Sequence, residues 1–373
     1  MSDFILRFWN ITGLAQLTAG NVVMMVIGCV MIFLAIKKDY EPLLLLPLGF
    51  GTILANIPAG GLLDAGPGGM FRYFFDLAIL TDVAPILLFF GVGAMTDLGP
   101  LLARPTLMLI SAAAQIGQFA ALLVATLFGY GIKEAAAIGI IGGANGPVTV
   151  FMATRLAPEL IGPIVVTAYL YMALVHLIQP PIMKLLTTEK ERRIAMSQIR
   201  PVSRGEKVAF VVAATIIASL LLPVGTPLFA FFMAGNLLRE SGVTDRLSNA
   251  AQNEITNIFI IVLVFGISYT LSADKFLNPR TLGILGLGLL GFGVSTAAGV
   301  LTAKFMKAIG RGDLNPLIGA AGLAAVPHSP RVVQQMGREA DSSNYLLMHA
   351  MGPNMGAIIA SSVVACVIYS LLT

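Results

Sequence analysis

Long stretches without a charged side chain alternate along this chain with short polar connections. A membrane-spanning helix needs about 20 apolar residues in a row, and most of the uncharged stretches reach that length. The pattern therefore predicts an all-α integral membrane protein with about 10–12 membrane elements. The stretches free of Asp, Glu, Lys and Arg cover residues 20–36, 42–63, 83–96, 105–132, 135–154, 161–183, 208–238, 255–273, 281–303 and 342–373.

Two of these stretches do not fit one plain helix. Residues 208–238 are too long for one span and contain Pro223 and Pro227, so we expect two helices there. Residues 83–96 are short, which predicts a half-helix or a re-entrant segment.

Composition supports a membrane location. Of 373 residues, 57% are hydrophobic and 11% are charged, whereas soluble domains carry roughly 25% charged residues. An ordinary soluble enzyme, a disordered chain and a secreted disulfide scaffold are therefore excluded. The net charge of +4 is scattered, so no nucleic-acid partner is expected. No GxxxxGK[ST] motif occurs, and ATP hydrolysis by this chain is not expected.

The polar connections suggest a division of the chain. We expect an interfacial segment at 1–19 with Trp9 near the lipid headgroups, and a first membrane repeat at 20–183. A basic loop follows at 184–207, and a second membrane repeat covers 208–373. The positive-inside rule places this basic loop in the cytoplasm.

An internal duplication is the reason for expecting two homologous repeats. The pattern I-G-x-x-G-x-A-x-x-P occurs at 138–147 and again at 318–327, an offset of 180 residues. The same offset relates Asn56 to Asn236. Glycine and proline interrupt helices, so each repeat is predicted to hold a broken or re-entrant helix pair, as in the inverted repeats of transporters. The alternative is close helix packing through small residues.

Polar side chains inside apolar runs are the candidate functional groups. The amides of Asn145, Asn315 and Asn354 offer neutral oxygen ligands for Na⁺, or hydrogen bonds between helices. His176 and His328 fit a proton relay or a structural role.

Two further side chains suit a reaction at a carboxyl group. Tyr171 lies well inside an apolar run, where its phenol is a possible proton donor. Arg331 follows the second motif, where a guanidinium fits a carboxylate. Snorkelling to the membrane surface is the alternative role for this arginine.

Six motifs resemble those of one family, the β subunits of the biotin-dependent, sodium-translocating decarboxylases that act on oxaloacetate, methylmalonyl-CoA, glutaconyl-CoA or malonate. Their order and spacing fit over nearly the whole chain. The motifs are GAMTD at 93–97, GGANGP at 142–147, YLYMALV at 169–175, IQPPIM at 178–183, NPLIGAAG at 315–322 and HAMGPN at 349–354.

The resemblance implies an activity. A biotin-carrying carboxyltransferase subunit would deliver carboxybiotin, and this subunit would decarboxylate it and couple CO₂ release to Na⁺ export across the cytoplasmic membrane of a bacterium. It also implies a small membrane subunit as partner, and a core with both motifs beside a scaffold that assembles as a trimer.

The resemblance also assigns residue roles. Tyr171 matches the family's proton-donating tyrosine, and Arg331 matches an arginine that holds the carboxyl group or shapes the site. Asn315, Gly319 and Asn354 match polar positions of the Na⁺ path. The biotin-binding residues are not assigned.

Two positions depart from the family pattern. Asn145 stands where the family usually has Asp, and Ala324 stands where it usually has Ser. An amide cannot titrate and a methyl group cannot bind a cation. Because His176 and His328 lie beside these motifs, our hypothesis is that coupling has moved from Na⁺ towards H⁺. A proton-coupled or uncoupled divergent member, an inactive scaffold, and a secondary transporter of a small organic anion remain the alternatives.

Overall fold

The computed structural model describes residues 9–310 and 313–373, and this part of the chain is helical without a strand. The all-α prediction is therefore confirmed. Residues 1–8 of the expected interfacial segment lie outside the described part, and Trp9 is 52% exposed.

One group of helices, here called the scaffold, comes from the beginning of each predicted repeat, and α3, α5, α15 and α17 pack against one another in it. Its members are α2 (Ala19–Lys38), α3 (Pro42–Ala55), α4 (Met70–Phe74), η1 (Phe75–Ile79), α5 (Val83–Met95), α14 (Arg204–Leu221), η5 (Pro223–Gly225), α15 (Thr226–Ser241), α16 (Asp245–Ala250), η6 (Ala251–Ile255), α17 (Thr256–Ser268) and α18 (Ala273–Phe276).

The second group, here called the core, packs around α19, which contacts α7, α8, α11, α12, η3 and η7. Its members are α6 (Gly99–Ala103), η2 (Pro105–Leu107), α7 (Met108–Ala114), α8 (Ile116–Leu127), α9 (Ile132–Ile140), η3 (Ile141–Gly143), α10 (Gly146–Leu156), η4 (Pro158–Leu160), α11 (Ile161–Ala173), α12 (Val175–Leu186), α13 (Glu189–Arg192), α19 (Pro279–Ala308), η7 (Pro316–Gly322), α20 (His328–Ala340) and α21 (Leu347–Leu372).

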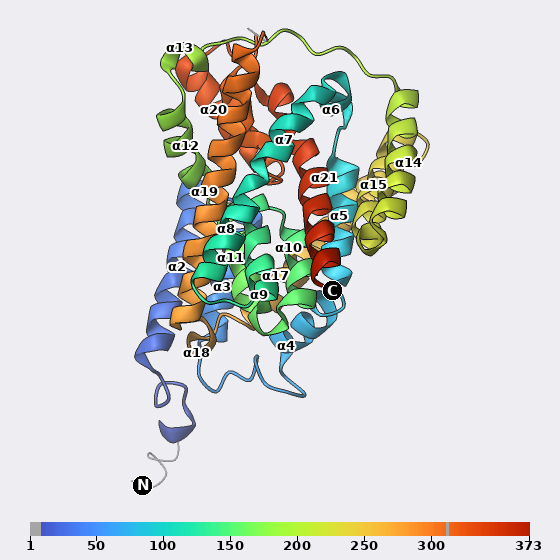
Figure 1. Cartoon of the computed structure of the whole chain (residues 1–373). Coiled ribbons are helices and arrows are strands. Elements are labelled where there is room, and N and C mark those ends of the chain that lie inside the picture. Colours follow the sequence, from blue (N-terminus) through green and yellow to red (C-terminus); the bar gives the residue numbers. More distant parts are fainter. Residues whose placement is uncertain (1–8, 311–312) are drawn as a thin grey trace.

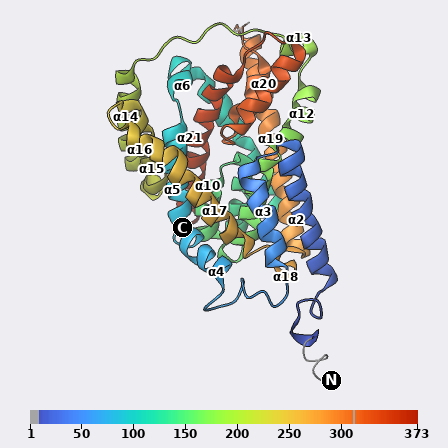
Figure 2. The same cartoon turned by 180° about the vertical axis from the view of Figure 1, so that it is seen from behind.

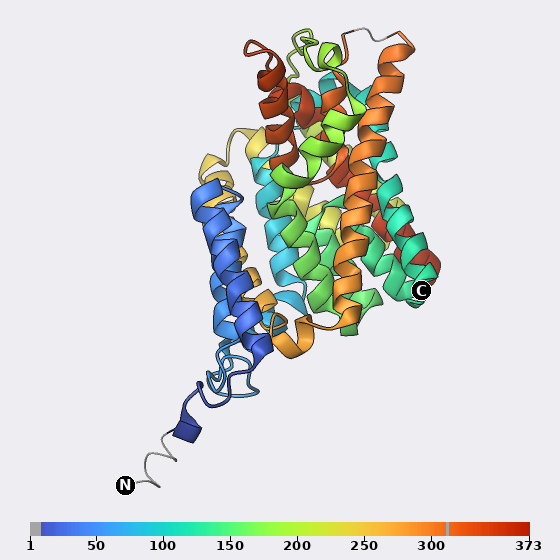
Figure 3. The same cartoon turned by 90° about the vertical axis from the view of Figure 1, so that its left-hand side faces the viewer.

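The views show how the two groups lie together. Figure 1 places α14 and α15 on one flank and the α8, α10 and α11 helices centrally, while the segment after α13 crosses one end of the molecule to reach α14. Figure 2 shows α2 and α3 side by side on the opposite flank, in agreement with their direct packing. In Figure 3 this pair stands apart from the long α19.

Five helices of the described part are long and apolar enough to cross a membrane, and two bent helix pairs raise the number to seven if each pair is one span. The chain is thus a multi-pass membrane protein. The break predicted near Pro223 is present, because α14 ends at Leu221 and α15 begins at Thr226. The stretch 161–183, expected as one span, instead bends by 66° between Ala173 and Val175.

The residues paired at the 180-residue offset have equivalent contacts, although the duplication itself stays a prediction. The amide of Asn56 donates to the carbonyl of Leu271 at 2.8 Å, just beyond the end of α17. The amide of Asn236 donates to the carbonyl of Thr96 at 2.6 Å, just beyond the end of α5. Asn236 therefore caps the carboxyl end of α5, where unpaired carbonyls need donors. Asn56 pairs with the loop after α17, so both contacts join the two predicted repeats.

Ion pairs fix the connections between the two groups. Arg155 of α10 lies 2.7 Å from Asp82, the residue before α5. Lys207 of α14 lies 2.7 Å from Asp97 and 3.2 Å from the buried Glu240. Burial would raise the pKa of the Asp97 carboxyl, but the hydrogen bond and charge of Lys207 bring this pKa below its ordinary value. The α5–α6 connection is therefore anchored to the α14–α15 hairpin.

Candidate functional site

The first broken segment joins α9 to α10. The single 3₁₀ turn η3 ends at Gly143, and Ala144 after it has a left-handed φ of 51°. Asn145 then caps α10, and its Oδ1 accepts the N–H of Val148 at 3.4 Å. A Cβ on Gly146 would lie 2.7 Å from the Tyr169 ring, so only glycine permits this approach. The helix N-terminus therefore lies directly against α11.

The second broken segment lies between η7 and α20. The backbone is extended at Leu323, and the Ala324 N–H donates to the carbonyl of Gly143 at 3.0 Å. The two motifs that the sequence places 180 residues apart are thus in direct contact. The segment ends at Pro327, after which α20 begins.

Buried amide side chains of neighbouring helices donate hydrogen bonds to backbone carbonyls that the second broken segment and η7 leave unpaired. Asn354 of α21 donates to the carbonyl of Leu323 at 2.6 Å, and Gln179 of α12 donates to the carbonyl of Ala320 at 2.9 Å. The amide of Asn145 donates to Ser361 Oγ at 2.9 Å. Within the described part of the chain, the side-chain oxygens of Asn354 and Gln179 are buried without a hydrogen-bond partner. Amide oxygens of this kind are ligands that suit a hard cation.

A cavity of about 500 Å³ opens between scaffold and core where the two broken segments meet. The N-terminal ends of α10 and α20 both reach it, and helix N-termini favour anions. Its scaffold lining comes from α3, α5, η6 and α17, and its core lining from α10, α11, α20 and α21. The polar and charged residues of the lining are Glu41, Asn145, Tyr169, Gln252, Asn253, Thr256, Asn257, His328 and Arg331.

The charged side chains of this cavity have different surroundings. His328 Nδ1 lies 2.7 Å from Glu41 Oε2. The side chain of Arg331, one turn further along α20, has no hydrogen bond or ion pair within residues 9–310 and 313–373. It also lines a second cavity of about 630 Å³ with Gln334 and Arg338. Arg331 therefore stands where the two cavities adjoin, with its guanidinium available to an anion.

Four residues that the sequence singled out line this one cavity: Asn145, Ala324, His328 and Arg331. Tyr171 does not, because its hydroxyl donates to the Leu285 carbonyl of α19. The phenol that borders the cavity belongs to Tyr169, and its buried hydroxyl has no hydrogen-bond partner. The assignment of Tyr171 as proton donor stays a prediction.

Three predicted Na⁺-path positions lie outside the cavity lining, and one of them is Asn354, whose hydrogen bond to Leu323 is described above. Asn315 caps η7 and donates to the carbonyls of Arg192 and Ile194 at 3.0 and 2.9 Å, which ties the basic loop to the core. Gly319 lies against the backbone of Gly299 in α19. Their part in a Na⁺ path also stays a prediction. His176 of α12 stacks on Tyr40 with ring centroids 6.2 Å apart.

Gly319→Ala is expected to destabilise the fold. Its Cβ would lie 2.2 Å from the Gly299 carbonyl oxygen, so backbone must move. Overpacking of this kind costs about 1–3 kcal/mol. Gly286→Ala is the matched control, because no atom lies within 4 Å of its Cβ position. Thermal unfolding in detergent should show a lower Tm for Gly319→Ala alone; equal Tm values for the two variants would contradict the packing argument.

Sequence reasoning missed the scaffold side of the cavity. Gln252, Asn253 and Asn257 carry amides at the start of an otherwise apolar span. Asn253 and Asn257 are four residues apart and so share one face of a helix, and this pair, with Gln252 beside it, was readable from the sequence. Glu41 gave no such signal, because a charge next to a span is the ordinary pattern.

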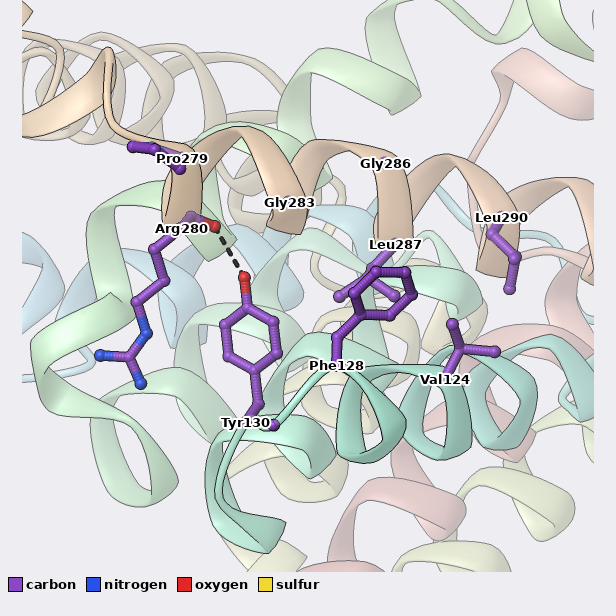
Figure 4. Close-up of a pocket in the computed structure, with 10 residues that line it drawn as sticks. Val124, Phe128, Tyr130, Pro279, Arg280, Gly283, Gly286, Leu287 and Leu290 are labelled. Atoms are coloured by element: carbon purple, nitrogen blue, oxygen red, sulfur yellow. Dashed lines mark hydrogen bonds between the residues drawn. The ribbon is translucent and has the colours of Figure 1, made fainter.

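A third cavity, of about 630 Å³, lies at the other end of α19 and contains no residue proposed for the site. Phe128 and Leu287 line it beside Gly283 and Gly286, and the Tyr130 hydroxyl donates to the Arg280 carbonyl at 2.8 Å (Figure 4). Among the described residues, none from either broken segment lines this third cavity, so we place the functional site at the scaffold–core cavity.

Comparison with known proteins identifies the family. The family model described as the Na⁺-transporting oxaloacetate decarboxylase β subunit matches residues 20–372 of this chain. The methylmalonyl-CoA decarboxylase β subunit of Veillonella parvula is 50% identical over 98% of this chain and 96% of its own length. The glutaconyl-CoA decarboxylase β subunit of Acidaminococcus fermentans is 50% identical over 98% and 97%. The oxaloacetate decarboxylase β chain of Klebsiella pneumoniae is 46% identical over 95% of each chain. The chain therefore belongs to the family of Na⁺-transporting oxaloacetate decarboxylase β subunits, which are membrane subunits of biotin-dependent decarboxylases.

Proposed function

We propose that this chain decarboxylates carboxybiotin and couples the release of CO₂ to cation movement across the cytoplasmic membrane of a bacterium. A biotin-carrying carboxyltransferase subunit delivers the carboxybiotin, and a small membrane subunit completes the complex, assembled as a trimer. The observation that carries this proposal is the scaffold–core cavity, where Arg331 and the N-termini of α10 and α20 meet. These groups favour a carboxylate.

The cation would pass along the broken segments of the core. Asn145 and Asn354 supply amide oxygens there, and the Asn354 oxygen is buried without a partner. A cation bound by neutral oxygens in a buried site needs several of them. The backbone carbonyls of the second broken segment, after η7, lie near these amides. Asn315 and Gly319 would form the part of this path nearer to the basic loop.

Proton coupling is the second candidate, and the lining of the cavity favours it. Position 145 has no carboxylate and position 324 has no hydroxyl, whereas His328 beside Glu41 offers a titratable group. In this version His328 and His176 relay the proton that decarboxylation consumes. A secondary transporter of a small organic anion would use the same cavity without chemistry.

Reconstitution distinguishes these functions. We expect proteoliposomes with this chain and its biotin carrier, carboxyltransferase and small membrane subunits to release CO₂ from carboxybiotin. Complexes lacking this chain should not do so. Uptake of ²²Na⁺ into inverted vesicles, compared with internal pH reported by pyranine, identifies the coupled ion. Carboxybiotin that decays equally fast without this chain would contradict the proposal, and uptake of a labelled dicarboxylate without any carboxybiotin would support the transporter instead.

A further inference from the structure

A carboxylate and an imidazole meet across the boundary between scaffold and core. His328 is the first residue of α20 in the core, and Glu41 is the residue before α3 in the scaffold. The atoms His328 Nδ1 and Glu41 Oε2 are 2.7 Å apart, and the two side chains are 10% and 12% exposed. Both residues line the scaffold–core cavity.

The backbone at Glu41 is held in a conformation that such a residue seldom adopts. Its φ of 40° and ψ of 65° are left-handed, and Pro42 follows directly, which disfavours helical conformations in the preceding residue. Strained backbone at a residue other than glycine persists only where surrounding contacts hold it, and it gathers at functional sites. Here the Glu41 carbonyl accepts the N–H groups of Leu44 and Leu45 at 3.0 and 2.9 Å, while the Glu41 carboxylate meets His328.

The titratable groups of the cavity are few. Asn145 and Ala324, which the family pattern would fill with a carboxylate and a hydroxyl, cannot exchange protons. Among the described residues of the lining, Glu41 is the carboxylate, His328 the imidazole, Arg331 the guanidinium and Tyr169 the phenol.

We propose that Glu41 is a positioning residue for decarboxylation, a role that rests on the proposed function. His328 Nδ1 lies 2.7 Å from Glu41 Oε2, and when the ring is protonated this ion pair orients it, as carboxylates do in other proton-transferring sites. The remaining ring nitrogen, Nε2, then serves the cavity. His328 Nε2 is the proton donor to the substrate, and Glu41 stabilises the imidazolium that carries the proton.

The step balances in atoms and electrons. The bond between the biotin ureido nitrogen and the carboxyl carbon breaks, and its electron pair stays on the nitrogen while CO₂ leaves. The proton on His328 Nε2 moves to that nitrogen and leaves neutral biotin. The imidazole becomes neutral with Nδ1–H still bound to Glu41, and a proton from water restores the imidazolium. One proton is consumed in each turnover.

Other charges near the pair work in both directions. Arg331 adds a positive charge to the lining of the cavity, and Glu41 adds a negative one. His176 interacts electrostatically with His328, Glu41, Arg331 and Asp39, so these groups form one cluster. The neutral phenols of Tyr40, stacked on His176, and Tyr169 complete the surroundings.

Glu41→Gln tests the inference, because it keeps the side-chain shape and a hydrogen-bond acceptor but removes the charge. With the reconstituted complex we expect kcat to fall about 10²-fold and KM to change little, since Arg331 still holds the carboxylate. The alkaline limb of the kcat–pH profile should move to lower pH, because the imidazolium loses its counter-charge. Glu41→Asp should restore part of kcat and return the limb towards its original position.

A second measurement needs no substrate. Diethyl pyrocarbonate modifies neutral imidazole, and mass spectrometry of the peptide containing His328 gives its rate in the intact chain. At a fixed pH we expect faster modification in Glu41→Gln than in the original chain. Glu134→Gln is the control, because Glu134 pairs with Arg280 at 2.7 Å, outside this cavity.

The outcomes separate this inference from the proposed function. An original complex that decarboxylates carboxybiotin, together with a Glu41→Gln complex of unchanged kcat and pH profile, overturns the role of Glu41 alone. An original complex without activity contradicts the proposed function, and an unchanged modification rate of His328 then overturns the pairing separately. If Glu41→Gln fails to fold, Glu41→Asp decides: a modification rate and pH profile near the original support the inference, and an alkaline limb at lower pH overturns it.

Discussion

Replacing Arg331 with alanine is expected to lower kcat/KM for carboxybiotin by about 10²–10³-fold, the loss seen when one preorganised donor is removed from an active site. Arg331 lines the scaffold–core cavity, and its guanidinium has no hydrogen bond or ion pair within the described residues, so its five N–H donors remain available to a ligand. A planar guanidinium binds a carboxylate through two parallel hydrogen bonds. The assembled complex, assayed for CO₂ release over a range of carboxybiotin concentrations, provides the measurement.

Two variants show whether charge or geometry matters. Arg331→Lys keeps the positive charge but loses the planar pair of N–H donors. We therefore expect its activity to lie between those of the original chain and Arg331→Ala. Arg338→Ala removes an arginine two turns further along α20, in the adjoining cavity but not in the scaffold–core cavity. It should retain activity. Activity of Arg331→Ala equal to that of Arg338→Ala would show that this guanidinium does not contact the carboxylate.

The membrane elements were predictable where a local signal marks their ends. Pro223 and Pro227 marked the break between α14 and α15, because proline removes a backbone donor and fixes φ. The bend at Leu174 had no such signal, since neither glycine nor proline occurs there. Tertiary contacts on its two sides accompany it instead. Tyr171 bonds to the Leu285 carbonyl of α19, and Gln179 bonds to the Ala320 carbonyl of η7.

The site was predictable in its motifs but not in all of its side chains. Gly142, Gly143 and Pro147 were enough to predict a broken helix, because these residues disfavour a continuous one. Tyr169 and Tyr171 could not be ranked in the same way. Residues two apart in a helix point about 200° away from each other, and only the packing decides which phenol borders the cavity.

Long-range contacts were beyond the reach of sequence reasoning. Glu41 and His328 are 287 positions apart in the chain and come from different predicted repeats, yet their side chains meet at 2.7 Å. No local pattern carries that information. Asn315 shows the same limit, because its local sequence did not indicate that its amide would hold the backbone of the basic loop.

Restoring the two residues of the family pattern is expected to create a Na⁺ requirement. Asn145 is 3% exposed and caps α10. An aspartate there would be a buried charge, which is costly without a partner, although the helix N-terminus favours it in part. Ala324, whose N–H already contacts the first broken segment, would gain a hydroxyl as Ser. Together the two changes add a carboxylate and a hydroxyl oxygen beside the opened carbonyls, which suits a hard cation.

The effect of Na⁺ on stability therefore distinguishes the double variant from the original chain. A cation that binds only the folded Asn145→Asp, Ala324→Ser chain stabilises it by about 2.7 kcal/mol at 100 times its Kd. Its Tm and its decarboxylation rate should therefore rise with NaCl but not with choline chloride at equal ionic strength. The original chain should show the smaller dependence on Na⁺ in both. Ala324→Ser alone separates the hydroxyl from the charge. If the double variant responds to Na⁺ no more than the original chain, the missing carboxylate does not determine the coupled ion, and the cation path must lie in groups that both chains share.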